Sequence, residues 1–180
     1  MRTGMSSVTS GETAAHTRTT PADLREAMSR FATGVIVLSV GGDNIHAMTA
    51  NAFSSVSLTP PTVLCCVSHD AVMHKAIMAE GRFGVSVLGA EHESLARHFA
   101  DKKRPLGAEQ FAGLAWEPGP LTRSPLLHGA LAWLECELAT YHDSGDHSIF
   151  IGDVVSARSG SDGAGLLFMR GRFQATPATG

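Results

Sequence analysis

Short apolar segments separated by turn-forming residues dominate the first half of the chain. Residues 35–40 are apolar and largely β-branched, residues 41–44 consist of Gly-Gly-Asp-Asn, and residues 45–49 return to a strand-like composition. Two such segments around a glycine-rich turn predict a β-hairpin. Residues 62–67 and 83–88 have the same apolar character, so each predicts a further strand.

Helical spacing occurs before and between these strands. Thr20 can cap a helix whose first position is Pro21. Three apolar residues then recur at helical spacing: Leu24, Met28 and Phe31. We predict that this helix presents one apolar stripe and ends at Gly34.

Two shorter helices are expected further along the chain. The first covers residues 70–81, where Asp70 can cap the first turn and Gly81 can end the last. The second covers residues 91–100. Residues 101–127 are rich in Pro and Gly, which predicts a long irregular excursion, and long loops of this kind are often functional.

The C-terminal third has a clearer period of two. In residues 132–138 the apolar side chains alternate with Glu135 and Glu137, which predicts a half-buried strand with both carboxylates facing solvent. A turn at residues 143–146 leads into a strand over residues 147–155. The last short strand is expected at Leu166–Met169.

About seven strands with few helices between them favour an antiparallel barrel over a doubly wound parallel sheet. We therefore expect a mainly β fold with peripheral helices. Residues 1–20 are rich in Ser, Thr and Gly and predict a disordered tail. The remaining length suits one domain over residues 21–175.

Composition and charge exclude several classes of function. The net charge is -3, with 14 basic and 17 acidic residues scattered along 180 positions, so no nucleic-acid or membrane-surface partner is indicated. The apolar runs are far shorter than the roughly 20 residues that span a bilayer. Three cysteines without a CxxC pair give no disulfide framework, which predicts a cytoplasmic protein.

Motifs of several well-known sites are missing. The sequence has no GxGxxG after a strand, no GxxxxGK and no GxSxG, so Rossmann, P-loop and serine-nucleophile sites are not indicated. His92 and His98 are six residues apart and would lie on different faces of a helix. Cys65 and Cys66 would point to opposite faces of a strand. The sequence therefore predicts no metal site.

Two segments carry a positive signal. Residues 48–61 combine a strand end, small hydroxyl and amide side chains, and a Pro pair, so a flat ring could approach the backbone closely. By composition alone this segment predicts a Ser-rich loop. Residues 141–147 contain a tight turn at Gly145 and Asp146 that would project His147 from the first position of a strand.

Together these segments resemble the short-chain flavin reductase family, whose fold is an antiparallel Greek-key, FMN-binding split β-barrel. The resemblance extends over about residues 22–173. The most specific elements are the Ser-Val-Ser-x-x-Pro-Pro stretch at residues 55–61 and Gly-Asp-His at residues 145–147. Weaker matches include Thr49–Phe53, Gly81–Leu88 and Leu166–Phe173.

The resemblance implies a set of cofactor-binding residues. Those expected along the flavin ring and its side chain are Thr49, Ala50, Asn51, Ala52, Ser54, Ser55, Cys65, Cys66, Val67 and Ser68. Phe99, Ala100 and Lys103 would meet the flavin phosphate. His147 would lie beside the nicotinamide as the catalytic residue, with Arg172 near the same opening.

This sequence departs from the family pattern at two places. The stretch at residues 101–105 is more basic than expected, which leaves the phosphate partner open. His74 occupies a position where a small hydroxyl residue is expected.

By resemblance, the chain would transfer a hydride from NADH or NADPH to FMN or FAD and supply the reduced flavin to a partner monooxygenase. The two cofactors would carry the chemistry, which explains a site without paired carboxylates. A homodimer is also implied. One alternative is a non-catalytic FMN-binding protein. The other is an enzyme like pyridoxamine-phosphate oxidase, which would need more cationic residues for a second phosphate.

Overall fold

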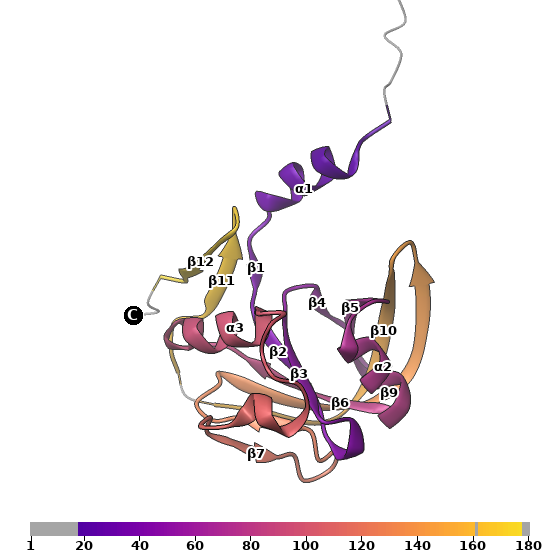
Figure 1. The fold of residues 1–180 in the computed structure, drawn as a ribbon, viewed down its shortest axis with the longest axis vertical. Helices are drawn as coiled ribbons and strands as arrows, with labels where there is room; N and C mark the ends of the chain where they lie inside the picture. Colours follow the sequence, from indigo (N-terminus) through magenta and orange to yellow (C-terminus); the bar gives the residue numbers. More distant parts are fainter. Residues whose placement is uncertain (1–17, 161, 178–180) are drawn as a thin grey trace, which may run out of the picture.

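The computed structural model describes residues 18–160 and 162–177, in which all strands pair in antiparallel fashion (Figure 1). The helices are α1 (Pro21–Ser29), α2 (Val72–Glu80) and α3 (Glu93–Ala100), with 3-10 turns η1 (Gly42–Asn44), η2 (Ala90–His92) and η3 (Gly107–Phe111). The strands are β1 (Thr33–Gly34), β2 (Ile36–Val40), β3 (His46–Ala50), β4 (Phe53–Leu58), β5 (Pro61–Ser68), β6 (Arg82–Val87), β7 (Trp116–Pro118), β8 (Pro125–Leu127), β9 (Ala132–Ser144), β10 (His147–Ser159), β11 (Leu166–Met169) and β12 (Arg172–Ala175). Most of the predicted N-terminal tail, residues 1–17, lies outside the described residues.

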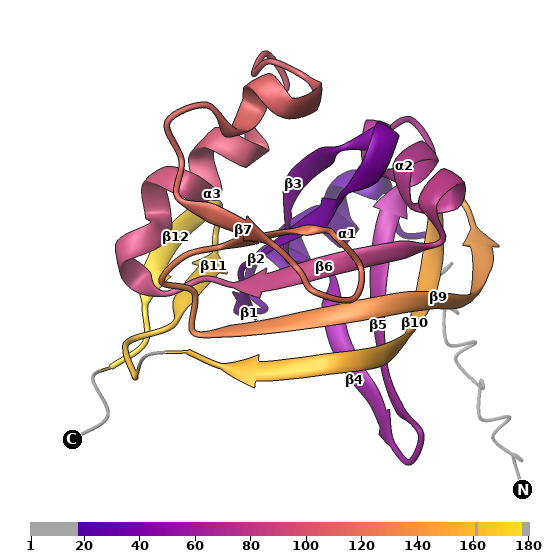
Figure 2. The same ribbon diagram turned by 90° about the horizontal axis from the view of Figure 1, so that it is seen from below.

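One large sheet organises the molecule. Its strand order is β3-β2-β6-β9-β10-β5-β4, and a second sheet, β1-β11-β12, lies at one edge. Figure 2 shows β6, β9 and β10 running side by side below the helices. The prediction of a mainly β, antiparallel fold with peripheral helices is confirmed. The described residues hold twelve strands where about seven were expected, because several short ones, among them β7 and β8 in the supposedly irregular excursion, have weak sequence signals.

Strand β2 separates two apolar cores. Its five residues are all buried, and successive side chains point to opposite faces of a strand. Leu38 therefore packs in one core with Phe83 and Phe150, whereas Val37 packs in the other with Phe99. Burial on both faces explains the continuous apolar run in the sequence.

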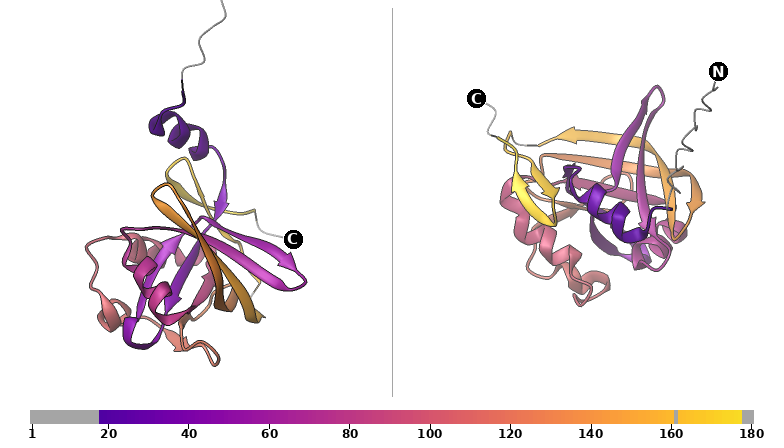
Figure 3. Two further views of the ribbon diagram at one scale, coloured as in Figure 1. Left: turned by 90° about the vertical axis from the view of Figure 1, so that its right-hand side faces the viewer. Right: turned by 90° about the horizontal axis from the view of Figure 1, so that it is seen from above.

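Helix α1 differs from its prediction. It ends at Ser29 instead of Gly34, which belongs to β1 and pairs with Leu167. The apolar stripe faces solvent, since Met28 is 53% exposed and Phe31 63% exposed. Figures 1 and 3 show α1 projecting away from the sheets. Because β1 begins soon after the helix ends, the helix does not pack against either core.

The Ser-rich segment is a strand and not the predicted loop. β4 pairs with β5 from Phe53 opposite Cys65 to Leu58 opposite Pro61, so the Pro pair closes a hairpin. The backbone hydrogen bonds between β4 and β5 outweigh the preference of serine for turns in this segment. In Figure 3 this hairpin extends as an arm from the large sheet.

Two further predictions are wrong: that Glu135 faces solvent and that Asp70 caps α2. Glu135 is buried, with 1% of its surface exposed, because residues 119–122 cover it. Its Oε2 accepts hydrogen bonds from the backbone N–H groups of Leu121 and Thr122 at 2.9 and 2.7 Å. The N-cap of α2 is Ala71, which makes no side-chain cap, so Asp70 does not cap this helix.

The end of α2 matches its prediction. Gly81 has φ 64°, the left-handed conformation that only glycine adopts without strain. Among the described residues, no helix is long and apolar enough to cross a membrane.

Candidate functional site

A cleft of about 450 Å³ lies where β3, β5, α2 and α3 meet. Four of the predicted cofactor-binding residues line it: Thr49, Ser68, Phe99 and Ala100. A smaller cavity of about 140 Å³ adjoins it and shares Thr49 and Ala100. Ala50 and Asn51 line this second cavity together with Phe168 and Phe173, and the two adjoining hollows together make up the candidate cleft.

Side-chain hydrogen bonds hold the walls of this cleft together. The Thr49 hydroxyl donates to the carbonyl oxygen of Ala96 at 2.7 Å, which fixes β3 against α3. The Asn51 amide donates to the hydroxyl of Thr33 at 3.1 Å, which ties the end of β3 to β1. Small residues between these anchors leave backbone accessible to a flat ligand.

The predicted turn at residues 145–147 meets the end of β5 through the pairing of β5 with β10. His147 lies opposite Ser68 in the register of these strands, although residues 68 and 147 are far apart in sequence. His147 begins β10, as predicted, and the preceding Gly145 has φ 63°, so the tight turn requires a glycine. His147 does not itself line the two cavities.

An exposed acidic partner orients the His147 ring. Nδ1 lies 2.8 Å from Asp146 Oδ1, and this hydrogen bond lowers the pKa of the Asp146 carboxyl. An ionised carboxylate can only accept, so Nδ1 carries the proton and Nε2 keeps its lone pair in the neutral ring. The ring can therefore accept a hydrogen bond at Nε2.

One end of the cleft is basic. Lys102 and Arg104 line it, whereas Lys103 does not and is exposed elsewhere. Arg104 donates through Nη1 to the carbonyl oxygen of Asp101 at 2.8 Å. Its Nε is buried and has no hydrogen-bond partner among the described residues. Such a donor is suited to an anionic oxygen.

Burial affects two titratable groups at this end. Burial, followed by the charge of Arg104, lowers the pKa of His46 to about 4. Burial also lowers the pKa of Arg104, while the Asp101 carboxylate opposes that shift. His46 is therefore neutral at pH 7, and Arg104 remains the cation because guanidinium does not deprotonate in proteins.

Several predicted residues lie outside the two cavities. Cys65 and Val67 point into the core, and burial raises the pKa of Cys65 to about 12, so this thiol is not ionised. Cys66 lies on the other face of β5 and donates its N–H to the Ala52 carbonyl at 3.0 Å. The rest are exposed: Ala52 just before β4, Ser54 and Ser55 on β4, and Arg172 on β12.

A polar cluster that the sequence did not predict lies beside His147. The buried Ser148 hydroxyl is 2.6 Å from Asp143 Oδ1, 2.8 Å from His74 Nε2 and 3.2 Å from His69 Nε2. The ligand atoms of the two histidines and the aspartate lie within 4.8 Å of one another, so they could hold a metal ion. Burial lowers the pKa of His74, and the charge of His69 adds to this effect.

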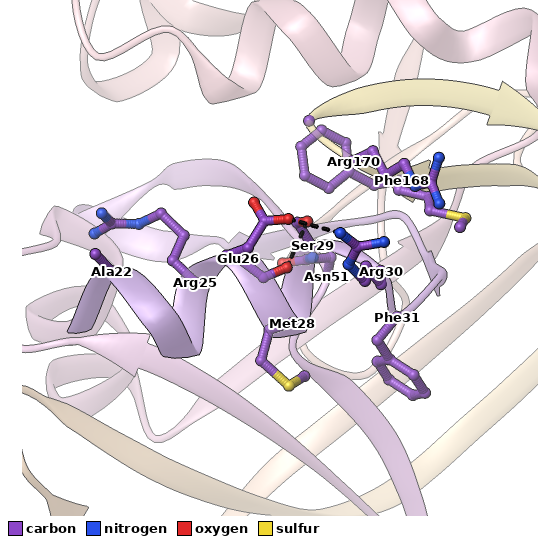
Figure 4. A pocket seen from close by; sticks show the side chains of 12 residues that line it. Ala22, Arg25, Glu26, Met28, Ser29, Arg30, Phe31, Asn51, Phe168 and Arg170 are labelled. Carbon is purple, nitrogen blue, oxygen red and sulfur yellow. Dashed lines mark hydrogen bonds and ion pairs between the residues drawn. The ribbon is translucent and has the colours of Figure 1, made fainter. Parts of the chain in front are cut away.

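A third hollow, about 870 Å³, lies between α1 and the β11–β12 turn and borders the cleft at Asn51 and Phe168 (Figure 4). Its walls include the exposed Met28 and Phe31 and the ion pair of Arg30 with Glu26 at 3.0 Å. Because one wall is a projecting helix, this hollow is an open gap and not a preformed ligand site.

Sequence reasoning missed Lys102, Arg104 and His46 in the cleft. The basic stretch at residues 101–105 was the available signal, but spacing could not show which cation turns inward. His69 and Asp143 gave no signal, because β5 and β9 approach each other only in the folded sheet.

Comparison with known proteins gives one consistent result. Residues 28–177 match the family described as flavin reductase like domain. The NADH-dependent FAD reductase of Streptomyces globisporus is 48% identical over 151 residues, which are 84% of this chain and 83% of that protein. The 4-hydroxyphenylacetate 3-monooxygenase reductase component of Salmonella typhimurium is 35% identical over 83% of this chain and 88% of that protein.

Solved structures agree with these matches. BorF, the flavin reductase component of a bacterial two-component tryptophan halogenase, superposes with a TM-score of 0.84 at 47% identity, covering 87% of this chain and 98% of that chain. The NADH:FAD oxidoreductase of Streptomyces globisporus, in complex with NAD and FAD fragments, has a TM-score of 0.80 at 46% identity, covering 85% of this chain and 90% of that chain.

Proposed function

Since the chain belongs to the family of flavin reductase like domains, we propose that it is the reductase component of a two-component system, supplying reduced flavin to a separate oxygenase. The protein is an oxidoreductase that uses NADH to reduce a flavin. FAD is the acceptor we favour, because the matches from Streptomyces globisporus, at 46–48% identity, are named as FAD reductases.

The cleft fits a flavin nucleotide. Its small residues at the end of β3 give a flat ring access to backbone, and Lys102 and Arg104 stand at the other end. The single observation that carries the assignment is the pair of basic side chains, Lys102 and Arg104, at one end of a cleft whose other end is lined by small residues. A flavin phosphate would pair with these cations.

When bound, the flavin provides N5 as the acceptor for the hydride from C4 of the nicotinamide. The chain supplies position and hydrogen bonds. Thr49 and Asn51 set the wall along the ring, and Arg104 and Lys102 hold the phosphate. His147 orients the nicotinamide from the neighbouring strand through its Nε2 lone pair. Holding both reactants in register converts a bimolecular reaction into an effectively unimolecular one.

We assign a homodimer on the basis of two exposed apolar surfaces. Helix α1 and the residues just after it present Leu24, Met28 and Phe31, each more than half exposed, and the β4–β5 hairpin presents Leu58 at 88% exposure. Both elements project from the body of the molecule (Figure 3). Burying them against a second copy removes apolar surface that a monomer would leave in water.

Light scattering after size-exclusion chromatography tests the dimer. We expect a mass of about twice the 18.9 kDa chain, and Phe31→Glu should shift it toward monomer by placing a charge in the interface. Arg123→Glu, at an exposed polar position, is the control that should stay dimeric. A wild-type monomer would overturn the assignment.

We also propose a cytoplasmic location, which the use of NADH and the free cysteines support. The reaction consumes a reduced nicotinamide nucleotide, and the three cysteines are free thiols in the structure, as suits a reducing compartment. Fractionation of cells that express the full chain tests this proposal.

Steady-state oxidation of NADH and NADPH, each crossed with FMN, FAD and riboflavin, tests the enzymatic assignment. We expect turnover that requires added flavin and favours NADH with FAD. A riboflavin rate equal to the FAD rate at low concentration would contradict a role for Arg104 and Lys102 in phosphate binding. Flavin binding without NADH oxidation would support the non-catalytic alternative.

A further inference from the structure

Three ligand atoms converge on one buried hydroxyl. Ser148 Oγ lies 2.6 Å from Asp143 Oδ1 and 2.8 Å from His74 Nε2. The Nε2 atom of His69 approaches the same oxygen to 3.2 Å. The hydroxyl has one proton, which the short contact to the carboxylate uses, so both imidazole nitrogens face its lone pairs.

One of the separations between ligand atoms matches a tetrahedral metal site, and the others are close to it. His69 Nε2 and Asp143 Oδ1 are 3.3 Å apart, and all three ligand atoms lie within 4.8 Å of one another. Zinc bonds of about 2.0–2.2 Å place neighbouring tetrahedral ligands roughly 3.3 Å apart. Small rotations of exposed side chains would bring the third ligand to the same spacing.

We propose that His69, His74 and Asp143 form a binding site for a divalent transition-metal cation of the zinc class. Two imidazole nitrogens and one carboxylate oxygen are a ligand set that zinc accepts with a fourth position left to water. Mg²⁺ and Ca²⁺ prefer oxygen ligands alone, so this set selects against them.

The three ligands come from different parts of the fold. His69 follows β5, His74 lies on α2 and Asp143 lies near the end of β9. The His74 ring packs edge-on against Phe150, with ring centroids 5.1 Å apart, and against His69 at 5.3 Å. One ligand is thus oriented by the core, and an ion would connect α2 to the hairpin that carries His147.

The site is accessible from solvent. The side chains of His69 and Asp143 are 40% and 65% exposed. A cation can therefore enter without opening the core. To bind the ion, each neutral imidazole would shift its ring proton from Nε2, where it faces the Ser148 lone pairs, to Nδ1.

Zinc titration of the full-length, untagged, metal-stripped protein by calorimetry tests the proposal. We expect one zinc ion per chain. His69→Ala, His74→Ala and Asp143→Asn should each weaken binding by about tenfold or more, because each removes one of three protein ligands. Asp143→Asn is the most informative variant, since its amide oxygen can still accept the hydrogen bond from Ser148 and the exposed position leaves the fold intact.

The matched control is His142→Ala, which removes an exposed histidine adjacent to Asp143 on the same strand. This variant should bind zinc with wild-type affinity, and an excess of Mg²⁺ should not compete. Absence of stoichiometric zinc binding would overturn the proposal. Wild-type zinc affinity in folded Asp143→Asn would also overturn it. So would a loss of zinc affinity in His142→Ala as large as that in the ligand variants. These titrations contain no flavin or NADH, so their outcome is separate from that of the reductase assay.

Discussion

Removing the His147 side chain should slow flavin reduction without unfolding the protein. Its Nδ1 donates to Asp146 at 2.8 Å, which leaves Nε2 free to accept a hydrogen bond from the carboxamide N–H₂ of the nicotinamide. Losing one orienting hydrogen bond costs about 1–3 kcal/mol, which corresponds to about a ten- to hundredfold slower reductive step in His147→Ala.

The fold should tolerate this substitution. The side chains of His147 and Asp146 are 45% and 92% exposed, and exposed ion pairs contribute about 0–1 kcal/mol to stability. We expect the melting temperature of His147→Ala to stay within a few degrees of the wild-type value. Asp146→Asn keeps an acceptor for the ring and should lose less activity than His147→Ala.

Rapid mixing of the flavin-loaded protein with NADH, followed by flavin absorbance, measures the reductive step directly. In His147→Ala the rate of flavin reduction should fall and the apparent dissociation constant for NADH should rise, while the affinity for flavin changes little. His142→Ala on the same hairpin is the control for a general effect of histidine removal. Wild-type reduction rates in folded His147→Ala would refute the orienting role and leave only a structural contact with Asp146.

Two other expectations follow from residues of the cleft, and a third tests Ser55, which is exposed on β4 outside the cleft. Lys102→Ala should weaken FAD binding about threefold or more and reduce its salt dependence, whereas the neighbouring Lys103→Ala should not, as fluorescence titration would show. The pKa of His46 is about 4 in the folded protein against an ordinary 6.5, so the unfolded state binds more protons between these values. The free energy of unfolding should therefore fall by about 2–3 kcal/mol as the pH drops from 6.5 to 4, and denaturant melts of His46→Gln should show a flatter profile. Ser55→Leu should weaken flavin binding in a folded protein if this exposed β4 position lies along the ring; unchanged affinity would remove it from the site.

The local pattern of residues along the chain was sufficient to predict most of the secondary structure. The strand over residues 35–40 and the end of α2 at Gly81 follow from β-branched composition and from the left-handed turn that glycine permits. The segments at residues 55–61 and 145–147 carried the most specific part of the family resemblance. These features depend on neighbours in sequence, so the sequence alone determines them.

Tertiary structure decided which residues share a site. Pairing of β5 with β10 places Ser68 opposite His147, and no local period encodes that register. A different pairing, that of β4 with β5, made the Ser-rich segment a strand.

Burial of polar groups was also decided by packing. Glu135 follows the alternation of an exposed face, yet a loop from residues 119–122 covers it and supplies its hydrogen-bond donors. Lys102 and Arg104 line the cleft whereas Lys103 does not, because the path of the chain after α3 sets the direction of each side chain. Sequence determines which side chains are available, whereas long-range contacts determine which of them face one another, because the energy that orients a side chain comes from partners distant along the chain.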